Sequence, residues 1–201
     1  MDIIPNNEAL RVFAGKRNCW AARQGNPVFS PTYFICLPHA PSRTGFGIIG
    51  GMKAWVQRVN RASVEIDGAV AGAVGRGYLV LFGVTHSDTG AMADRLADRI
   101  VKLRIFEDDA GKTNRSVTDV AGSVLVVSQF TLYADTRHGN RPGFSDAARP
   151  DLAIPLYERF VARLRSLLGD NRVATGRFGA YMKVSLENDG PFSVELIEGE
   201  R

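Results

Sequence analysis

The sequence predicts an α+β domain in which an antiparallel, barrel-like sheet, arranged as a meander, packs with two helices. Three observations predict this class. Short alternating or apolar runs recur between turn residues, only two segments have the period of an amphipathic helix, and strands and helices seldom alternate. The 201 residues, 45% of them hydrophobic, are enough for one domain with a sizeable core.

The first 51 residues differ from the rest of the chain. They show no sustained period of either kind, and Pro and Gly interrupt every apolar run. We interpret 1–51 as a disordered extension or, because the strand pattern begins abruptly at Met52, as read-through upstream of a natural start there. A transit peptide is a further alternative. Residues 52–201 form the expected domain.

The first part of the domain, residues 53–84, shows the sequence pattern of β-strands. Residues 53–59 form one strand, 62–66 alternate strictly, and Asp67-Gly68 is a strong hairpin turn before 70–74 returns. Residues 78–84 are an apolar run suited to a central strand. These strands indicate a meander.

Two helices follow from apolar residues at helical spacing. The first has Ser87 or Asp88 as its cap, and its apolar stripe consists of Met92, Leu96, Ile100 and Leu103. The second ends at Gly169 and starts near Asp151, since Pro155 must lie in or near its first turn. Its apolar face consists of Leu156, Phe160, Leu164 and Leu167.

The segment Val124–Leu132 changes character halfway along. Four aliphatic residues read as a strand buried on both faces, and then Ser128, Gln129 and Thr131 bring polar groups to its end. Such groups either bond to neighbouring backbone or face a pocket. A long loop over 133–145 follows, and its placement suggests a wall of the same pocket. Further strands are expected at 172–178, 181–186 and 192–197, the last two joined by a turn containing Gly190-Pro191.

Composition and missing motifs exclude several kinds of protein. The first 51 residues carry five basic and two acidic residues, so the remainder has a net charge of only +1 out of +4 and no broad basic surface. Both cysteines, Cys19 and Cys36, lie in that first quarter, and only His86 and His138 lie beyond it. No G-x-S-x-G, H-E-x-x-H or Walker pattern occurs, so we expect no metal or other cofactor. No apolar run approaches the roughly 20 residues of a membrane span.

Two separated motifs resemble one family. Ser128-Gln129-Phe130-Thr131-Leu132 with Ala134-Asp135, and Asn188-Asp189-Gly190-Pro191, are similar to the paired signature of the D-aminoacyl-tRNA deacylases. The resemblance spans Met52 to Ile197 and includes four further segments, namely 57–64, 104–106, Arg141-Pro142 and 175–178. Residues 1–51 have no counterpart in it, which favours a start at Met52.

The resemblance implies a cytoplasmic hydrolase that removes D-amino acids, or glycine mischarged on tRNA-Ala, from the terminal adenosine of tRNA. It implies a homodimer in which a cis Gly190-Pro191 segment enters the neighbouring subunit's pocket and rejects L-aminoacyl groups. It places catalysis at Ser128, Gln129, Phe130 and Thr131. Phe130 and Met182 are candidates for the adenosine pocket, and Arg58 for ordering the pocket, although packing roles explain Met182 and Arg58 equally well.

The chemical step needs an oxyanion site, which backbone N–H groups around Phe130 and Thr131 would supply. The Thr131 hydroxyl is an alternative nucleophile, but no base partner is visible, so we favour attack by water aided by the ribose 2′-OH. One alternative function is a related editor with a trans Gly190-Pro191 bond that removes L-alanine. The other is a non-catalytic tRNA-binding module.

Overall fold

The structure is a computed structural model of the chain, and it describes residues 50–199. The predictions for 1–51, a disordered extension or read-through, therefore lie outside the described residues except for Gly50 and Gly51. None of the described helices is both long enough and apolar enough to pass through a bilayer.

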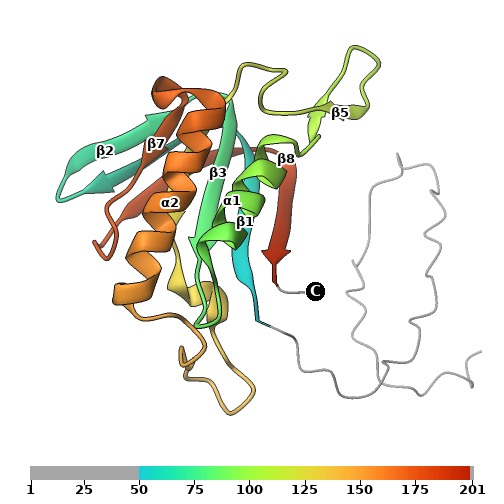
Figure 1. The fold of residues 1–201 in the computed structure, drawn as a ribbon. Helices are drawn as coiled ribbons and strands as arrows, with labels where there is room; N and C mark the ends of the chain where they lie inside the picture. The colour runs from blue at the N-terminus through green and yellow to red at the C-terminus, as the bar shows by residue number, and fades with distance from the viewer. Residues whose placement is uncertain (1–49, 200–201) are drawn as a thin grey trace, which may run out of the picture. The chain divides into compact units, whose positions relative to one another are not determined.

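The described chain folds into a bent sheet with two helices on one side (Figure 1). The strands are β1 (Met52–Ile66), β2 (Ala69–Val74), β3 (Gly77–Gly83), β4 (Phe106–Glu107), β5 (Thr113–Arg115), β6 (Ser123–Ser128), β7 (Val173–Thr175) and β8 (Lys183–Glu198). The helices are α1 (Gly90–Val101) and α2 (Pro150–Leu168), with short 3-10 turns η1 (Phe130–Tyr133) and η2 (Asp170–Arg172).

The barrel-like sheet with two packed helices is confirmed, but the purely antiparallel meander is corrected. The strand order is β2-β1-β3-β6-β7, with β8 on the other edge of β1, and the pairs β3–β6 and β6–β7 are parallel. Parallel neighbours need a crossover connection. The two helices lie in these crossovers, α1 between β3 and β6 and α2 between β6 and β7. The two predicted helices were therefore the signal for a mixed sheet.

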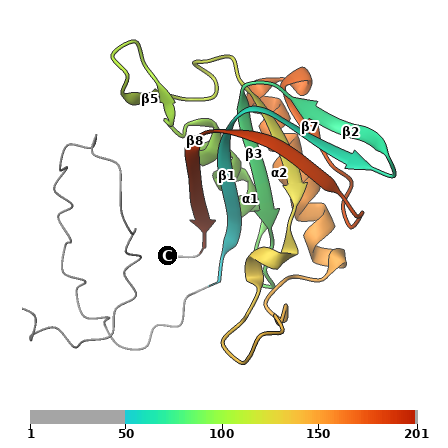
Figure 2. The same cartoon turned by 180° about the vertical axis from the view of Figure 1, so that it is seen from behind.

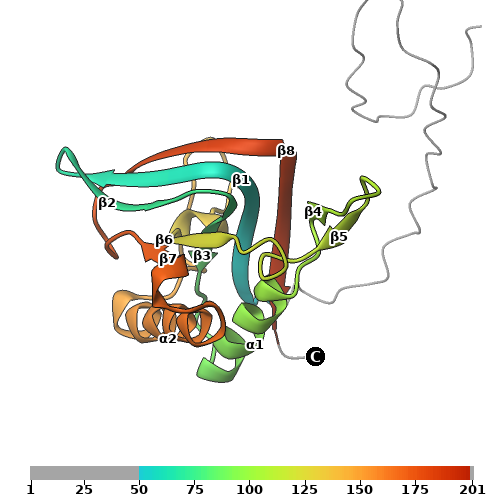
Figure 3. The same ribbon diagram turned by 90° about the horizontal axis from the view of Figure 1, so that it is seen from above.

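Two long strands replace four predicted short ones. β1 continues through the expected break at residue 60, and β8 continues through 187–191, so Gly190-Pro191 lies within a strand instead of in a turn. Figure 2 shows β1 and β8 side by side, and Figure 3 shows both bending together. The pairing between them shifts register on both sides of Val59, opposite Asn188. Extra residues of this kind bend a strand, which explains the shape.

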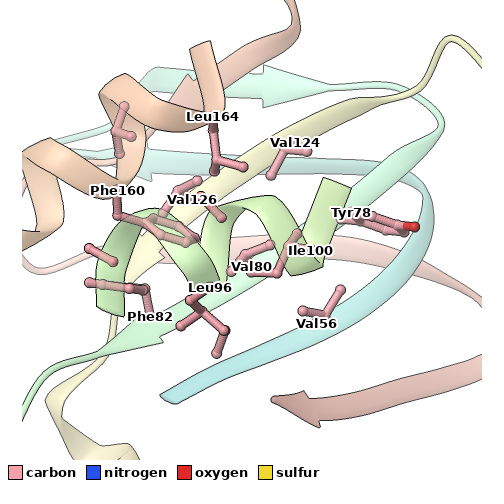
Figure 4. Close-up of a cluster of buried hydrophobic side chains, with 14 of the residues drawn as sticks. Val56, Tyr78, Val80, Phe82, Leu96, Ile100, Val124, Val126, Phe160 and Leu164 are labelled. Atoms are coloured by element: carbon pink, nitrogen blue, oxygen red, sulfur yellow. The ribbon is translucent and has the colours of Figure 1, made fainter. Parts of the chain in front are cut away.

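The main core lies between the helices and one face of the sheet. Figure 4 shows apolar side chains from β1, β3 and β6 meeting those of both helices, among them Val56, Val80, Phe82, Val126, Leu96 and Phe160. The rings of Phe82 and Phe160 stack with centroids 4.3 Å apart. This contact joins α2 to the central strand.

The opposite face of the sheet encloses a second, smaller core, which contains Val59, Val64, Leu79, Leu125 and Val127. Both faces of β3 and β6 are thus buried, as their continuous apolar runs predicted. The sheet nearly closes where β2 approaches β7. A Cβ on Gly72 would lie 2.7 Å from the carbonyl oxygen of Thr175, so glycine is required for this approach.

The first helix begins differently from the prediction. Thr89 is its N-cap residue, with no side-chain capping hydrogen bond. Asp88 instead is buried, and its Oδ2 accepts a hydrogen bond from the Thr85 N–H at 2.7 Å. The second helix begins at Pro150 and ends at Leu168, with Gly169 as its C-cap residue, close to the predicted bounds, and Pro155 lies inside it.

Candidate active site

The polar end of β6 leads directly into η1. The Gln129 N–H donates to the Phe82 carbonyl at 2.7 Å, which extends the β3–β6 pairing by one bond before the chain turns. The buried Tyr133 hydroxyl then donates to the carbonyls of Gly51 at 2.8 Å and Gly83 at 3.1 Å. Burial raises the pKa of Tyr133 well above its ordinary value, so the hydroxyl keeps its proton and anchors the turn.

A cavity of about 260 Å³ opens beside this turn. It is lined by the ends of β3 and β6, the start of α2, and the segment before β8 together with the start of β8, namely Phe82–Val84, Val127–Phe130, Ala148, Ala153, Phe178–Met182 and, within β8, Val184. Among these residues only Tyr181 has a titratable side chain. The lining therefore contains no histidine, carboxylate or amine for proton transfer.

The cavity brings together four of the residues predicted for the site, Ser128, Gln129, Phe130 and Met182. Thr131 lies next to it but is not part of its lining. The Thr131 hydroxyl oxygen instead accepts a hydrogen bond from the Gln129 side-chain amide. A Cβ on Gly176 would overlap the Met182 sulfur, so the glycine leaves space for this part of the wall.

The N–H groups of Phe130 and Thr131 are the first two of the 3-10 turn. Such leading N–H groups have no partner inside their own helix. Among residues 50–199, no other acceptor is bonded to either of them. The two donors are therefore available to a ligand with a partial negative charge.

Gly190, Pro191 and Arg58 are not among the residues that line this cavity. The Gly190–Pro191 peptide bond is cis, and the segment lies in β8 opposite the register shift of β1. The buried Arg58 guanidinium donates to the Asp189 carbonyl at 2.9 Å and lies 5.0 Å from the centre of the Phe192 ring. It also donates to the carbonyl of Ile105. Arg58 therefore braces the residues on both sides of Gly190-Pro191.

Sequence reasoning missed several residues of the cavity, above all Phe178 and Tyr181. The Phe178 ring contacts that of Tyr157 edge to face, with centroids 5.9 Å apart, and so takes its position from α2. Burial raises the pKa of Tyr157 to about 12. The only sequence signal for Phe178 was its place in the matching segment 175–178.

A second cavity, of about 640 Å³, lies on the other side of η1. Lys53, His86, Asp135, Arg137 and Asp146 line it, so opposite charges face each other there. Within the part of the chain that the structure describes, no three His, Cys, Asp or Glu residues are grouped to hold a metal ion.

The fold and the cavity define a small α+β domain in which two main-chain N–H groups without a partner among residues 50–199 follow a strand end, beside a cavity lined by no histidine, carboxylate or amine. The family model described as D-Tyr-tRNA(Tyr) deacylase matches residues 55–197, and the chain belongs to this family.

Curated relatives bear the name D-aminoacyl-tRNA deacylase, and two solved structures are similar to the chain. The chain is similar to the D-aminoacyl-tRNA deacylases of Symbiobacterium thermophilum (54% identity, 75% of this chain, 97% of that protein) and Anaeromyxobacter dehalogenans (58%, 75% and 99%). It is also similar to a solved structure named c-Myc DNA Unwinding Element Binding Protein, with a TM-score of 0.70 and 41% identity over 74% of this chain and 99% of that one. A probable eukaryotic D-amino acid tRNA deacylase shares the fold, with a TM-score of 0.64 and 18% identity over 72% and 98%.

Proposed function

We propose that this protein is a hydrolase that cleaves the ester bond between a D-amino acid and the 3′-terminal adenosine of tRNA. The products are free D-amino acid and tRNA, and the reaction is a proofreading step of translation. Membership of the deacylase family supports the reaction class. Glycine attached to tRNA-Ala is a second proposed substrate, because it has no side chain on either side of its α-carbon. We place the activity in the cytoplasm, where aminoacyl-tRNA is used.

The observation that carries the mechanism is the pair of unbonded N–H groups at Phe130 and Thr131 beside a cavity without acid–base side chains. Attack on an ester carbonyl puts negative charge on its oxygen. Two main-chain donors stabilise that charge, and loss of one such donor typically costs about 3–4 kcal/mol. Ser128, Gln129 and Phe130 hold the ester, while Phe130 and Met182 contact the adenosine.

Water is the proposed nucleophile. Its oxygen forms the new bond to the ester carbon, the bond to the ribose 3′-oxygen breaks, and a proton passes to that oxygen with help from the neighbouring 2′-OH. The Thr131 hydroxyl accepts a hydrogen bond from the Gln129 side-chain amide, and within residues 50–199 no base accepts the proton that it would lose as a nucleophile. The RNA therefore supplies the group that the protein lacks, which also selects RNA over DNA.

The chiral choice is proposed to come from a second copy of the chain. In a homodimer, the Gly190-Pro191 segment would enter the partner's cavity and direct main-chain carbonyl oxygens at the substrate α-carbon, where an L side chain would clash. Exposed apolar side chains on β1 and β8, namely Trp55, Leu186 and Ile197, support a protein contact there. Within residues 50–199, no strand pairs with the outer edge of β8. Arg58 would position the segment from its own subunit.

Residues 52–201 are proposed to form the deacylase domain, since the family match spans residues 55–197. The start at Met52 stays a proposal. Mass spectrometry of the native protein tests it, and a mature terminus well before Met52 would contradict it.

A deacylation assay with matched D- and L-tyrosyl-tRNA tests the function. We expect hydrolysis of the D ester and no hydrolysis of the L ester above the uncatalysed rate. Equal rates on both would refute chiral selection, while hydrolysis of L-alanyl-tRNA would instead favour the related editor. RNA binding without turnover of any ester would favour the non-catalytic module.

A further inference from the structure

Two exposed phenylalanines meet at the edge of the candidate active site. Phe130 is 57% exposed and Phe144 is 38% exposed, and their rings touch edge to face with centroids 5.0 Å apart. Phe130 lines the 260 Å³ cavity, whereas Phe144 does not. The pair therefore runs outward from the cavity onto the surface of the protein.

The loop that carries Phe144 is held in place. Asp135 and Gly143 exchange two main-chain hydrogen bonds of 2.8 Å, which close the loop immediately before Phe144. The Phe144 carbonyl then accepts a hydrogen bond from the Ala147 N–H at 3.1 Å. The ring is thus presented by a fixed backbone, and the water-exposed position is a feature of the fold.

The same loop carries a small excess of basic residues. Between residues 134 and 149 it carries three arginines and one histidine against two aspartates. Asp135 pairs with Arg137, whereas Arg141 forms no ion pair with any residue in the range 50–199. An arginine without an ion pair in the described part of the chain, three residues before Phe144 in the same loop, suits a strand that carries both bases and phosphates.

We propose that Phe130 and Phe144 form a stacking surface for an unpaired base of the RNA strand that precedes the terminal adenosine. The inference rests on the proposed function and extends it from the last nucleotide to its neighbour. The adenosine occupies the cavity, the strand leaves past Phe130, and the next base lies on the aromatic pair. Unpaired RNA is commonly bound in this way, by stacking on aromatic side chains.

The test compares a substrate that carries the RNA strand before the terminal adenosine with one that consists of the adenosine ester alone. One is D-tyrosyl-tRNA, and the other is D-tyrosyl-adenosine, which has no preceding nucleotide. For Phe144→Ala we expect the ratio of kcat/KM for the tRNA to that for the adenosine ester to fall roughly 10-fold, the range of one lost stacking contact. Phe144→Tyr should restore the ratio, because it restores an aromatic ring.

Leu167→Ala is the matched control, since Leu167 is an exposed apolar residue at the far end of α2 and its loss should leave the ratio unchanged. An equal effect of Phe144→Ala on both substrates, or no effect, would overturn the stacking role alone. Sedimentation of Phe144→Ala gives a second check: a change in oligomeric state would assign the ring to a protein contact and reject the RNA contact. Failure of the unmodified protein on D-tyrosyl-tRNA would instead refute the proposed function itself.

Discussion

The Arg58 guanidinium binds both the main-chain carbonyl and the side-chain carboxylate of Asp189. Its Nε lies 2.9 Å from the Asp189 carbonyl oxygen and 3.0 Å from the carboxylate Oδ2. Asp189 directly precedes Gly190, and Arg58 is almost fully buried beneath it. The position of the Gly190-Pro191 segment therefore depends on a side chain from β1.

Replacing Arg58 with alanine should destabilise the protein and impair selection. The change leaves the Asp189 and Ile105 carbonyls without their charged donor, so we expect a loss of about 1.5–3 kcal/mol of unfolding free energy. Urea unfolding measures it. Arg61→Ala is the control on the same strand, because its exposed pair with Glu187 should contribute only about 0–1 kcal/mol. Equal losses in the two variants would show that Arg58 has no special bracing role.

Replacing Gly190 with alanine should impair hydrolysis through a steric clash. A Cβ there would lie 2.5 Å from the Phe192 nitrogen, and Gly190 has a φ of +150°, which L residues rarely adopt. The segment must move, and a misplacement of about 1 Å can cost about 100-fold in rate. Turnover of D-tyrosyl-tRNA measures the effect. Gly75→Ala, where a Cβ meets nothing within 4 Å, should retain normal turnover.

Replacing Thr131 with valine should leave most of the activity. Valine keeps the shape and the main-chain N–H but removes the hydroxyl, so kcat should stay within about threefold, against the roughly 100-fold or greater loss expected for a group that performs proton transfer or nucleophilic attack. A substrate with a 2′-deoxyribose should, by contrast, be almost inert. Single-turnover rates with both substrates distinguish RNA-assisted attack by water from nucleophilic attack by Thr131. Normal cleavage of the deoxy substrate by an enzyme that fails without Thr131 would reject the RNA-assisted route.

The buried Asp88 carboxyl should make the free energy of unfolding depend on pH. Its Oδ1 has no partner within residues 50–199, and burial raises its pKa from 3.8 to about 6. The folded state thus binds this proton more tightly than the unfolded state. The contribution is fully present below about pH 4 and is lost as the pH rises to about 6, a loss on the order of 3 kcal/mol. Urea unfolding of the wild type and Asp88→Asn between pH 4 and 7 should give a difference that grows with pH in favour of the variant.

Asp94 is a control for which the pH dependence of the unfolding free energy has the opposite sign. The Arg159 side chain lowers the pKa of Asp94, so its contribution is present above the ordinary pKa and is lost as the pH falls. Asp94→Asn should therefore be most destabilising near neutral pH. A flat difference curve for Asp88→Asn would rule out titration of the buried carboxyl.

The elements that the sequence predicted well are those with local signals. The Asp67-Gly68 turn has positive φ at both residues, and Gly169 ends α2 with a φ of +93°. The apolar runs of β3 and β6 are buried on both faces, as a central strand requires. Pairing partners have no such signal, because they depend on contacts between segments far apart in the chain. For this reason, the parallel pairs and the continuity of β1 and β8 were missed.

In the candidate site, residues that are adjacent in the sequence were predicted, whereas residues that only the fold brings together were missed. Ser128, Gln129 and Phe130 stand together in the sequence and face the cavity together, but Phe178 reaches it only because α2 and β7 return to β6. Asp88 shows that a local signal can also predict the wrong role. Its position before a helix predicts a cap, yet its carboxylate accepts a hydrogen bond from the N–H of Thr85, three residues earlier in the chain.

Residues 188–191 lie inside β8 and not at the tip of a connecting loop. Residues 189–192 span the register shift without a partner in β1, but the β8 residues on either side of them are paired with β1. The proposed discrimination between mirror-image substrates would then depend on the integrity of the whole sheet as well as on the segment itself.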